Sequence, residues 1–274
     1  MIWEIILNKH NYKYVVYMVF SLANPELLSF LYKYRVFCKE DFPSSGRAIL
    51  DYSKELTVFI IYWINILMIA ISFAVYIITK HNPFFESISR RLYHTILYMC
   101  GIVLTNVNKY VQNCYFKKII YERTNNTPYL ERFYLFLKNR DTFFFNIFLH
   151  RFLNSDQDDI HDHPWGFFHI VISGGYWEYI TVNEDGTTLD QGIKKVWRSP
   201  GYYNIVSSQY KHRIVLSDEK PWTLFIPFER HDTWNFWIPL VWKNGEPCTE
   251  GDINDDDVLK STKWKCVPHH LYKK

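Results

Sequence analysis

The pattern of apolar residues changes near residue 125. Before that point the chain has long apolar runs with few glycines, which is typical of helices. Beyond it, short stretches rich in aromatic and β-branched residues alternate with turn residues, which is typical of strands. We therefore expect an α-helical region over 1–124, a mainly β domain over 125–245 and a charged tail over 246–274.

The longest apolar run covers residues 56–79 and contains no charged residue and one strongly polar residue, Asn65. At about 1.5 Å per residue, a helix of this length exceeds the roughly 30 Å hydrocarbon core of a bilayer. Helices of soluble proteins normally have a polar face, whereas this run is apolar all round. We therefore predict a transmembrane helix over 56–79, with a buried helix of a soluble core as the alternative.

Two weaker apolar runs flank the first. Residues 92–107 are predicted as a second span, an interfacial helix or a helix packed on the first, because His94 lies within the run. Residues 14–32 are interrupted by Pro25, which would break a helix. The basic residues on the two sides of 56–79 are nearly balanced. We expect a single-pass or two-pass membrane protein with the β domain on the cytoplasmic side.

Beyond Phe143, about seven short apolar stretches such as FFHIVIS and HRIVL are separated by turn residues, as in a β-sandwich or barrel. Within them lies His161-Asp162-His163. In a strand, residues two apart project from one face, so both imidazoles can reach one ion at ~2.0–2.2 Å. Two histidines on the surface of an edge strand are the alternative interpretation.

Residues around this pair resemble those of a known superfamily. Pro164 follows the pair, Gly174-Gly175 forms a turn, and His212 begins a later strand after Pro200-Gly201. This layout resembles the cupin superfamily, whose first motif is His-x-His followed by Glu and Gly, and whose second is Pro-x-Gly followed by His. The resemblance implies a cupin barrel, a double-stranded β-helix, with a divalent metal ion (Fe, Mn, Ni or Zn) held by His161, His163 and His212.

The sequence departs from the superfamily pattern at three points. The glutamate of the first motif falls on Phe167 or Phe168, the second motif is shortened, and Leu216 stands where an asparagine is expected. Two ligand sets therefore stay open. One is a three-histidine set, as in cupins that resemble cysteine dioxygenase. The other adds Glu178 from the strand after the Gly-Gly turn, for which a solvated strand residue is the alternative.

A closer resemblance covers about residues 129–240. The run HDHPWGFFHIVISGGYWEY and its flanking strands resemble a group of uncharacterised cupin-like proteins of bacteria, phages and large DNA viruses, and Asn235 departs from the last motif of that group. The resemblance implies membership of this group and no particular reaction. A composition rich in Ile, Asn, Tyr and Lys is typical of an AT-rich genome, viral or protist.

Further residues are predicted around the metal ion or in a pocket, where ligand histidines need hydrogen-bond partners and a planar cation with aromatic rings can bind a ligand. These are His169, Asp162, Arg213, Arg230 and Trp234. Ordinary strand packing is the alternative for the last two.

Charge and cysteine content narrow the function. The net charge is +3 and the basic residues are scattered, so no nucleic-acid partner is predicted. The five cysteines are widely spaced, which favours reduced thiols in an intracellular compartment. The leading hypothesis is a membrane-tethered, metal-dependent cupin that acts on an unknown small molecule, with a reaction of the dioxygenase or isomerase type.

Two alternatives stay open. The missing glutamate favours a non-catalytic module that binds a ligand or has a structural role. The N-terminal half could also reflect an upstream extension of the reading frame.

Overall fold

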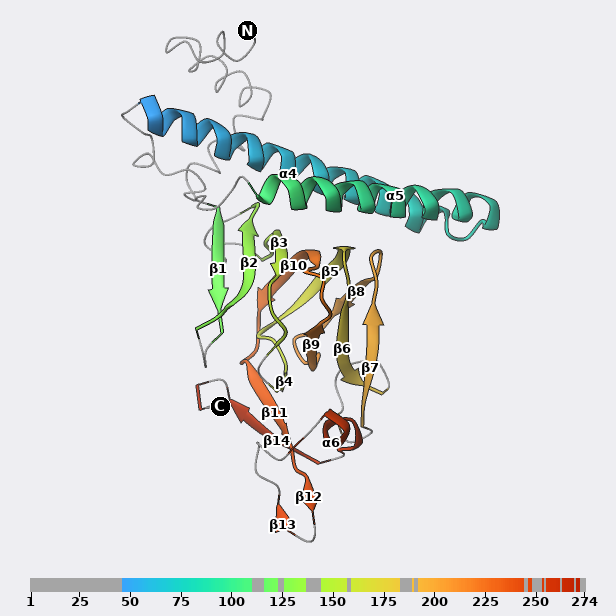
Figure 1. Ribbon diagram of the computed structural model, residues 1–274. Helices are drawn as coiled ribbons and strands as arrows, with labels where there is room; N and C mark the ends of the chain where they lie inside the picture. Colours follow the sequence, from blue (N-terminus) through green and yellow to red (C-terminus); the bar gives the residue numbers. More distant parts are fainter. Residues whose placement is uncertain are drawn as a thin grey trace.

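The computed structural model combines a helix pair with a β-barrel (Figure 1). It describes residues 46–109, 116–122, 126–136, 144–156, 159–182, 189, 192–243, 246–247, 253, 255–261, 263–268 and 270–271. The predicted apolar segment 14–32 lies outside the described residues.

The barrel consists of two facing antiparallel sheets in jelly-roll order. One contains the order β3-β10-β5-β8 and the other the order β4-β9-β6-β7. Consecutive strands alternate between the two sheets except at the β6–β7 hairpin, which is the strand order of a double-stranded β-helix. The predicted fold class is confirmed. The strands are β3 (Phe148–Phe152), β4 (Ile160–His161), β5 (Trp165–Ser173), β6 (Tyr176–Thr181), β7 (Ile193–Arg198), β8 (Tyr203–Val206), β9 (His212–Leu216) and β10 (Trp222–Arg230).

Strand β5 shows why the sequence forms this barrel. Its alternate residues Phe167 and His169 face the barrel interior, whereas Ile170 and Ile172 on the other face pack in the core beneath the helices. Because both faces are covered, the strand is apolar almost throughout.

Additional strands extend both sheets. β1 (Lys117–Tyr121) and β2 (Pro128–Tyr134) lie beside β3, and β11 (Asn235–Pro239) and β14 (Trp264–Pro268) lie beside β4. The sheet therefore begins before residue 125, the predicted boundary, and part of the predicted tail is a strand of the second sheet. Two shorter elements complete this end, the hairpin of β12 (Trp242–Lys243) with β13 (Glu246–Pro247), and α6 (Asp255–Lys260).

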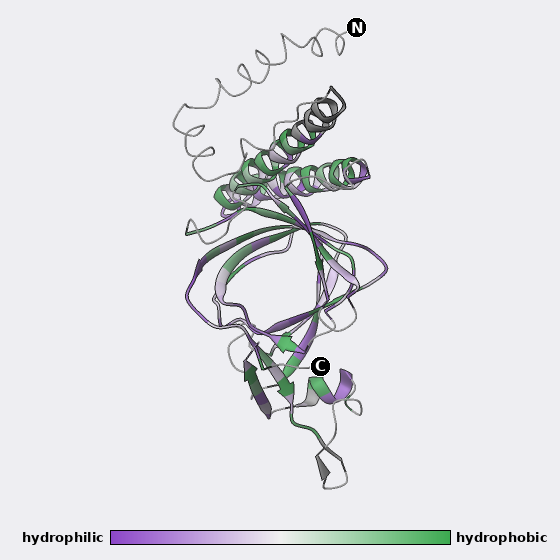
Figure 2. Ribbon diagram, turned by 90° about the vertical axis from the view of Figure 1, so that its left-hand side faces the viewer, coloured by the Kyte–Doolittle hydropathy of each residue, from purple (hydrophilic) through white to green (hydrophobic). Residues whose placement is uncertain are grey.

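The helices α4 (Gly46–Thr79) and α5 (Pro83–Asn108) lie side by side across the outer face of the first sheet (Figures 1 and 2). A short turn joins them. In that turn the Asn82 side chain caps α5 by accepting hydrogen bonds from Phe84 N and Phe85 N, and Pro83 occupies the first turn of the helix.

Helices and barrel share one hydrophobic core. Tyr62 of α4 is fully buried, with its ring centroid 5.2 Å from that of Phe133 and 6.2 Å from that of Trp222. α5 approaches the barrel so closely that a Cβ at Gly101 would lie 2.5 Å from Ser173 Cβ. The helix pair is therefore an integral layer of this fold.

The two apolar runs predicted as membrane spans, 56–79 and 92–107, lie in α4 and α5. Thr57–Thr79 is a helix long and apolar enough to cross a membrane, and 33% of the residues in its most apolar stretch are buried. Residues 92–107 lie in α5, where Tyr93, Leu97 and Leu104 are buried against α4 and the barrel. Of the interpretations open for that run, the structure shows a helix packed on the first.

Candidate metal centre

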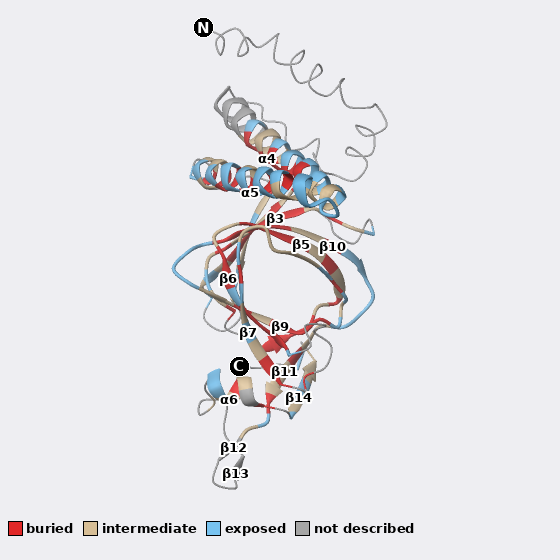
Figure 3. Ribbon diagram, turned by 90° about the vertical axis from the view of Figure 1, so that its right-hand side faces the viewer, coloured by how far each residue is buried: buried red, intermediate tan, exposed pale blue. Residues whose placement is uncertain are grey.

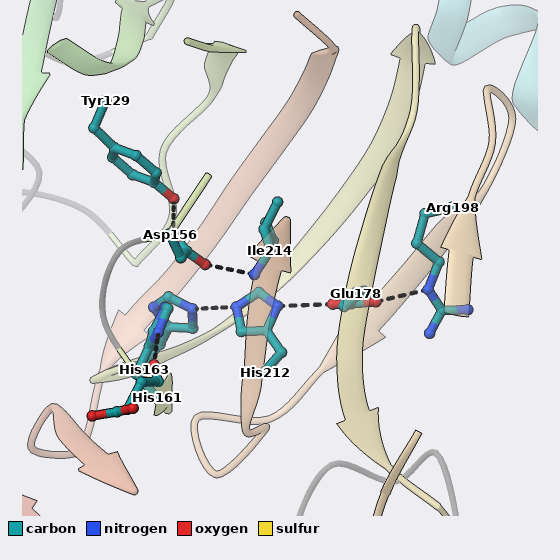
Figure 4. Close-up of polar contacts among 9 residues, drawn as sticks. Tyr129, Asp156, His161, His163, Glu178, Arg198, His212 and Ile214 are labelled. Carbon is teal, nitrogen blue, oxygen red and sulfur yellow. Dashed lines mark hydrogen bonds and ion pairs between the residues drawn. The ribbon is translucent and has the colours of Figure 1, made fainter. Parts of the chain in front are cut away.

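Three imidazoles from the second sheet converge inside the barrel (Figure 4). His161 ends β4, His163 follows it by two residues, and His212 begins β9 directly opposite His161. One nitrogen of each ring belongs to a cluster in which all atoms lie within 4.8 Å of one another. The structure therefore brings together the three residues that the sequence predicted as ligands.

The nitrogen spacing suits a shared ion. Nε2 of His163 lies 2.9 Å from Nε2 of His212. Two adjacent ligands of an octahedral ion at ~2.1 Å are about 3.0 Å apart, because their directions form a right angle.

Neighbouring groups orient two of the three rings. The Nδ1–H of His212 donates to Glu178 Oε1 at 2.8 Å, and the Nδ1–H of His161 donates to the Asp159 carbonyl oxygen at 3.2 Å. A neutral imidazole that donates through Nδ1 carries its lone pair on Nε2. These contacts therefore place the lone pair of both rings on Nε2, the nitrogen that would bind a metal ion, and carboxylate–histidine pairs of this kind are common at metal sites.

Glu178 lies behind His212 and outside the nitrogen cluster (Figure 4). Its carboxylate is fully buried, and Oε2 accepts a hydrogen bond from Arg198 Nε at 2.7 Å. Burial would raise the pKa of Glu178, but the hydrogen bond from His212 and the positive charge of Arg198 lower it to about 2. The sequence left open whether Glu178 is a fourth ligand. In the structure the Glu178 carboxylate contacts Nδ1 of His212 instead, because β6 pairs with β9.

A cavity of about 410 Å³ adjoins the three histidines inside the barrel. Aromatic rings form much of its wall, with Phe167 5.2 Å from His163 and Phe225 4.7 Å from Phe167, measured between ring centroids. The volume is in the usual range for a small-molecule site. Trp234, predicted at a pocket, lines this cavity.

His169 also lines the cavity, as a buried residue of the opposite sheet. Burial chiefly lowers its pKa, to about 4, so the ring is neutral at pH 7. Its buried Nε2 has no hydrogen-bond partner among the described residues.

The structure places three other predicted residues away from the metal ligands. Asp162 turns toward β11, where it accepts hydrogen bonds from Asn235 N at 2.7 Å and Trp237 Nε1 at 3.1 Å. Arg213 follows His212 and so points to the outer face, where it pairs with Asp255 at 3.5 Å. Arg230 is exposed at the end of β10.

Sequence reasoning missed a second polar group on the cavity wall. The Tyr129 hydroxyl donates to Asp156 Oδ1, and Ile214 N donates to Asp156 Oδ2 at 2.6 Å (Figure 4). Asp156 lies in the polar loop SDQDD, where nothing distinguishes it from its neighbours. Two more missed residues, Arg132 and His150, line the same cavity from β2 and β3.

Comparisons with known proteins find similarity only among solved structures. No family model and no curated protein matches the chain. Solved structures similar to it include a cupin-2 domain from Rhodospirillum rubrum, with 11% identity, 51% of this chain and 80% of that chain covered, and a TM-score of 0.32. A cupin superfamily protein from Desulfitobacterium hafniense DCB-2 has 14% identity, 40% and 84% coverage and a TM-score of 0.27.

Fe(II)-HppE in complex with an alternative substrate is a third similar structure, with 14% identity, 52% of this chain and 83% of that chain covered, and a TM-score of 0.31. At these identities and scores the likeness carries no functional argument. The strand order and the contacts described above are what assign the fold and define the site.

Proposed function

We propose that the barrel binds one divalent metal ion through His161, His163 and His212 and that a small molecule binds beside that ion in the cavity. The observation that carries this proposal is the convergence of three imidazole nitrogens, two of them on rings oriented through Nδ1. Imidazole suits Fe, Mn, Ni and Zn alike, so the metal is left open.

The residues around the ligands have defined tasks in this proposal. Glu178 holds His212 in the tautomer that binds metal, and Arg198 keeps Glu178 ionised. Phe167 and Phe225 keep the cavity wall beside the ligands apolar. Three protein ligands leave positions open for a substrate and for water or O₂, where a bound ion supplies Lewis-acid or redox chemistry. A reaction of the dioxygenase or isomerase type is the catalytic form of the proposal.

A non-catalytic module that binds a small ligand is the second candidate. One observation favours it, because among the described residues no carboxylate joins the three nitrogens.

Metal content of the purified full-length protein tests the metal site. We expect about one equivalent of metal after equilibration with Zn²⁺ or Mn²⁺ and gel filtration, and less than a tenth of that in a His161→Ala/His163→Ala/His212→Ala variant. His231→Ala, which removes an exposed imidazole, is the matched control and should bind as wild type does. A wild-type protein that binds no metal, or a triple variant that binds as much, contradicts the proposal.

We also propose that the helix pair attaches the protein to a membrane. The outer face of the pair is apolar and exposed, and Figure 3 shows both helices largely exposed on this side of the molecule. Ile78 is 75% and Phe84 is 69% exposed. Exposed apolar surface of this extent marks an interaction site. The patch comprises Ile64, Leu67, Met68, Ile71, Val75 and Ile78 of α4 with Phe84, Phe85, Ile88 and Leu92 of α5.

Charge and packing favour a helix pair that lies along the membrane surface. Lys80, Arg90 and Arg91 are exposed beside the apolar patch, where cations interact with anionic headgroups. The opposite face of α4, including Tyr62 and Ile69, packs on the barrel, so a crossing helix would take the first sheet into the hydrocarbon. The predicted crossing over 56–79 and the cytoplasmic side of the barrel stay predictions.

Flotation with vesicles of phosphatidylcholine and phosphatidylserine tests membrane attachment. Full-length protein should float with the vesicles, and a Leu67→Glu/Ile71→Glu variant should float much less because two charges enter the apolar patch. Protein that stays in the soluble fraction with and without vesicles contradicts the proposal.

A further inference from the structure

Arg132 is a cation on the inner wall of the barrel. It lies on β2 between Glu131 and Phe133, which face outward, so alternation directs its side chain inward to the cavity. Its guanidinium lies 5.0 Å from the centre of the Phe148 ring, and Nε donates a hydrogen bond to His150 Nε2 at 2.9 Å. These contacts hold the guanidinium in one place.

The partners of Arg132 in the described part of the chain carry no negative charge. Burial lowers the pKa of His150 well below its ordinary value, and the charge of Arg132 lowers it further, so His150 is a neutral acceptor. Among the described residues, no carboxylate is ion-paired with Arg132. Arg132 is half-buried, and a guanidinium stays protonated there, so its charge favours an anionic partner from outside the chain.

Carboxylates nearby are engaged elsewhere. Glu131, the preceding residue, pairs on the outer face with Lys117 at 2.7 Å and Arg151 at 3.2 Å. Asp156 on the cavity wall accepts hydrogen bonds from Tyr129 and Ile214.

Glu122, also on the cavity wall, accepts a hydrogen bond from Thr127 at 2.7 Å. It lies beyond the end of β1, whereas Arg132 is opposite Lys118 near the other end of that strand. At about 3.3 Å per residue the two positions are roughly 13 Å apart along the strand. In the described part of the chain, neither of these two carboxylates on the cavity wall forms an ion pair with Arg132.

We propose that the barrel cavity takes a small molecule with a carboxylate group on an apolar body, and that Arg132 binds the carboxylate. The planar fork of a guanidinium matches a carboxylate in two parallel hydrogen bonds. The apolar body would pack against apolar side chains of the cavity wall, such as Leu130, Phe152 and Ile214.

The same cavity connects Arg132 to the three histidines. A row of four neighbouring rings joins the two ends. The distance between ring centroids is 4.8 Å from His150 to Phe225, 4.7 Å from Phe225 to Phe167, and 5.2 Å from Phe167 to His163. A ligand anchored at Arg132 therefore extends along these rings toward the metal ligands. Only this second end rests on the proposed metal function, because the carboxylate end depends on Arg132 alone.

Binding of two matched probes to metal-free, full-length protein tests the proposal. The probes are 3-phenylpropanoate and its neutral isostere 3-phenylpropanamide, and titration calorimetry measures their affinities after metal is removed with chelator. We expect wild type to bind the acid roughly 10- to 100-fold more tightly than the amide, as a charge-assisted pair predicts. Arg132→Gln should remove this preference and leave amide binding unchanged. Lys220→Gln, which removes an exposed cation from the turn before β10, should retain it.

Wild-type protein that binds acid and amide equally, or neither at millimolar concentration, overturns the proposal. An acid preference that survives in Arg132→Gln overturns it as well. If that variant does not fold by circular dichroism, Arg132→Lys takes its place and should lower the ratio of acid to amide affinity without abolishing it. The calorimetry is done without metal, so its result does not depend on the metal site. If wild type prefers the acid but fails the metal-binding test, the proposed metal function is contradicted and the role of Arg132 stands.

Discussion

Replacement of Glu178 by glutamine separates the orientation of a metal ligand from the stability of the barrel. The carboxylate accepts one hydrogen bond from His212 Nδ1 at 2.8 Å and another from Arg198 Nε at 2.7 Å, and it is fully buried. A glutamine side chain has a single acceptor oxygen. In Glu178→Gln, either His212 or Arg198 therefore faces an amide N–H, which is a second donor.

Two effects of different size follow from this geometry. Loss of the group that orients a ligand histidine typically lowers metal affinity by about 10- to 100-fold, or roughly 1.4 to 2.7 kcal/mol. Removal of one partner from a buried ion pair costs about 3 kcal/mol or more in the free energy of unfolding. The first effect is specific to Glu178, whereas the second is expected at any buried carboxylate that pairs with a cation.

Glu131→Gln is the matched control. Glu131 is a buried carboxylate that pairs with Lys117 at 2.7 Å and Arg151 at 3.2 Å, on the outer face of the other sheet. Zn²⁺ affinity by chelator competition and unfolding in urea are measured for both variants. Both should lose stability, but only Glu178→Gln should lose metal affinity. A Glu178→Gln protein that binds Zn²⁺ as tightly as wild type, or an equal loss in both variants, refutes the orienting role.

Three further predictions concern the site and the fold. His163→Ala should lower Zn²⁺ affinity by about 100-fold or more while His169→Ala changes it little, and equal losses would contradict the ligand assignment. Burial alone would raise the pKa of Glu131, but its hydrogen bond with Lys117 and that cation's charge lower it, so its stabilisation is full above an unfolded pKa of about 4.3 and is lost as pH falls below it. The free energy of unfolding in urea, measured from pH 7 to pH 3, should thus depend less on pH in Glu131→Gln than in wild type. Parallel pH profiles of the two proteins would contradict the stabilising role of the Glu131 carboxylate. Gly101→Ala should lower the free energy of unfolding by about 1–3 kcal/mol. A Cβ at Gly101 of α5 would lie 2.5 Å from Ser173 Cβ, and an unchanged free energy of unfolding would argue against close docking of α5.

The sequence predicted the strands and the three histidines because both depend on local patterns. Alternation in β5 indicates a strand, and a His-x-His pair followed by a late His212 resembles a cupin metal site. The role of Glu178 depends instead on the pairing of β6 with β9, which sets it opposite Ile214. No local pattern encodes that register. The sequence therefore identified Glu178 as a candidate site residue, but it did not predict the contact of Glu178 with His212 Nδ1.

Arg132 and the helix layer show two other limits. Arg132 precedes the strands that were recognised, and its importance follows from the cavity across the barrel, which residues distant in sequence form. In α4 the run is apolar on every side, so its periodicity could not show that Tyr62 and Ile69 pack on a barrel while Leu67 and Ile71 are exposed. A predicted membrane span and a helix covering a sheet have the same sequence pattern here.

Anomalous diffraction from crystals grown with MnCl₂ tests the metal centre most directly, because it locates the ion itself. The account predicts one strong peak about 2.0–2.2 Å from Nε2 of each of His161, His163 and His212, with Glu178 still bonded to His212 Nδ1. No peak at the three histidines, or a peak coordinated by the Glu178 carboxylate, would contradict it.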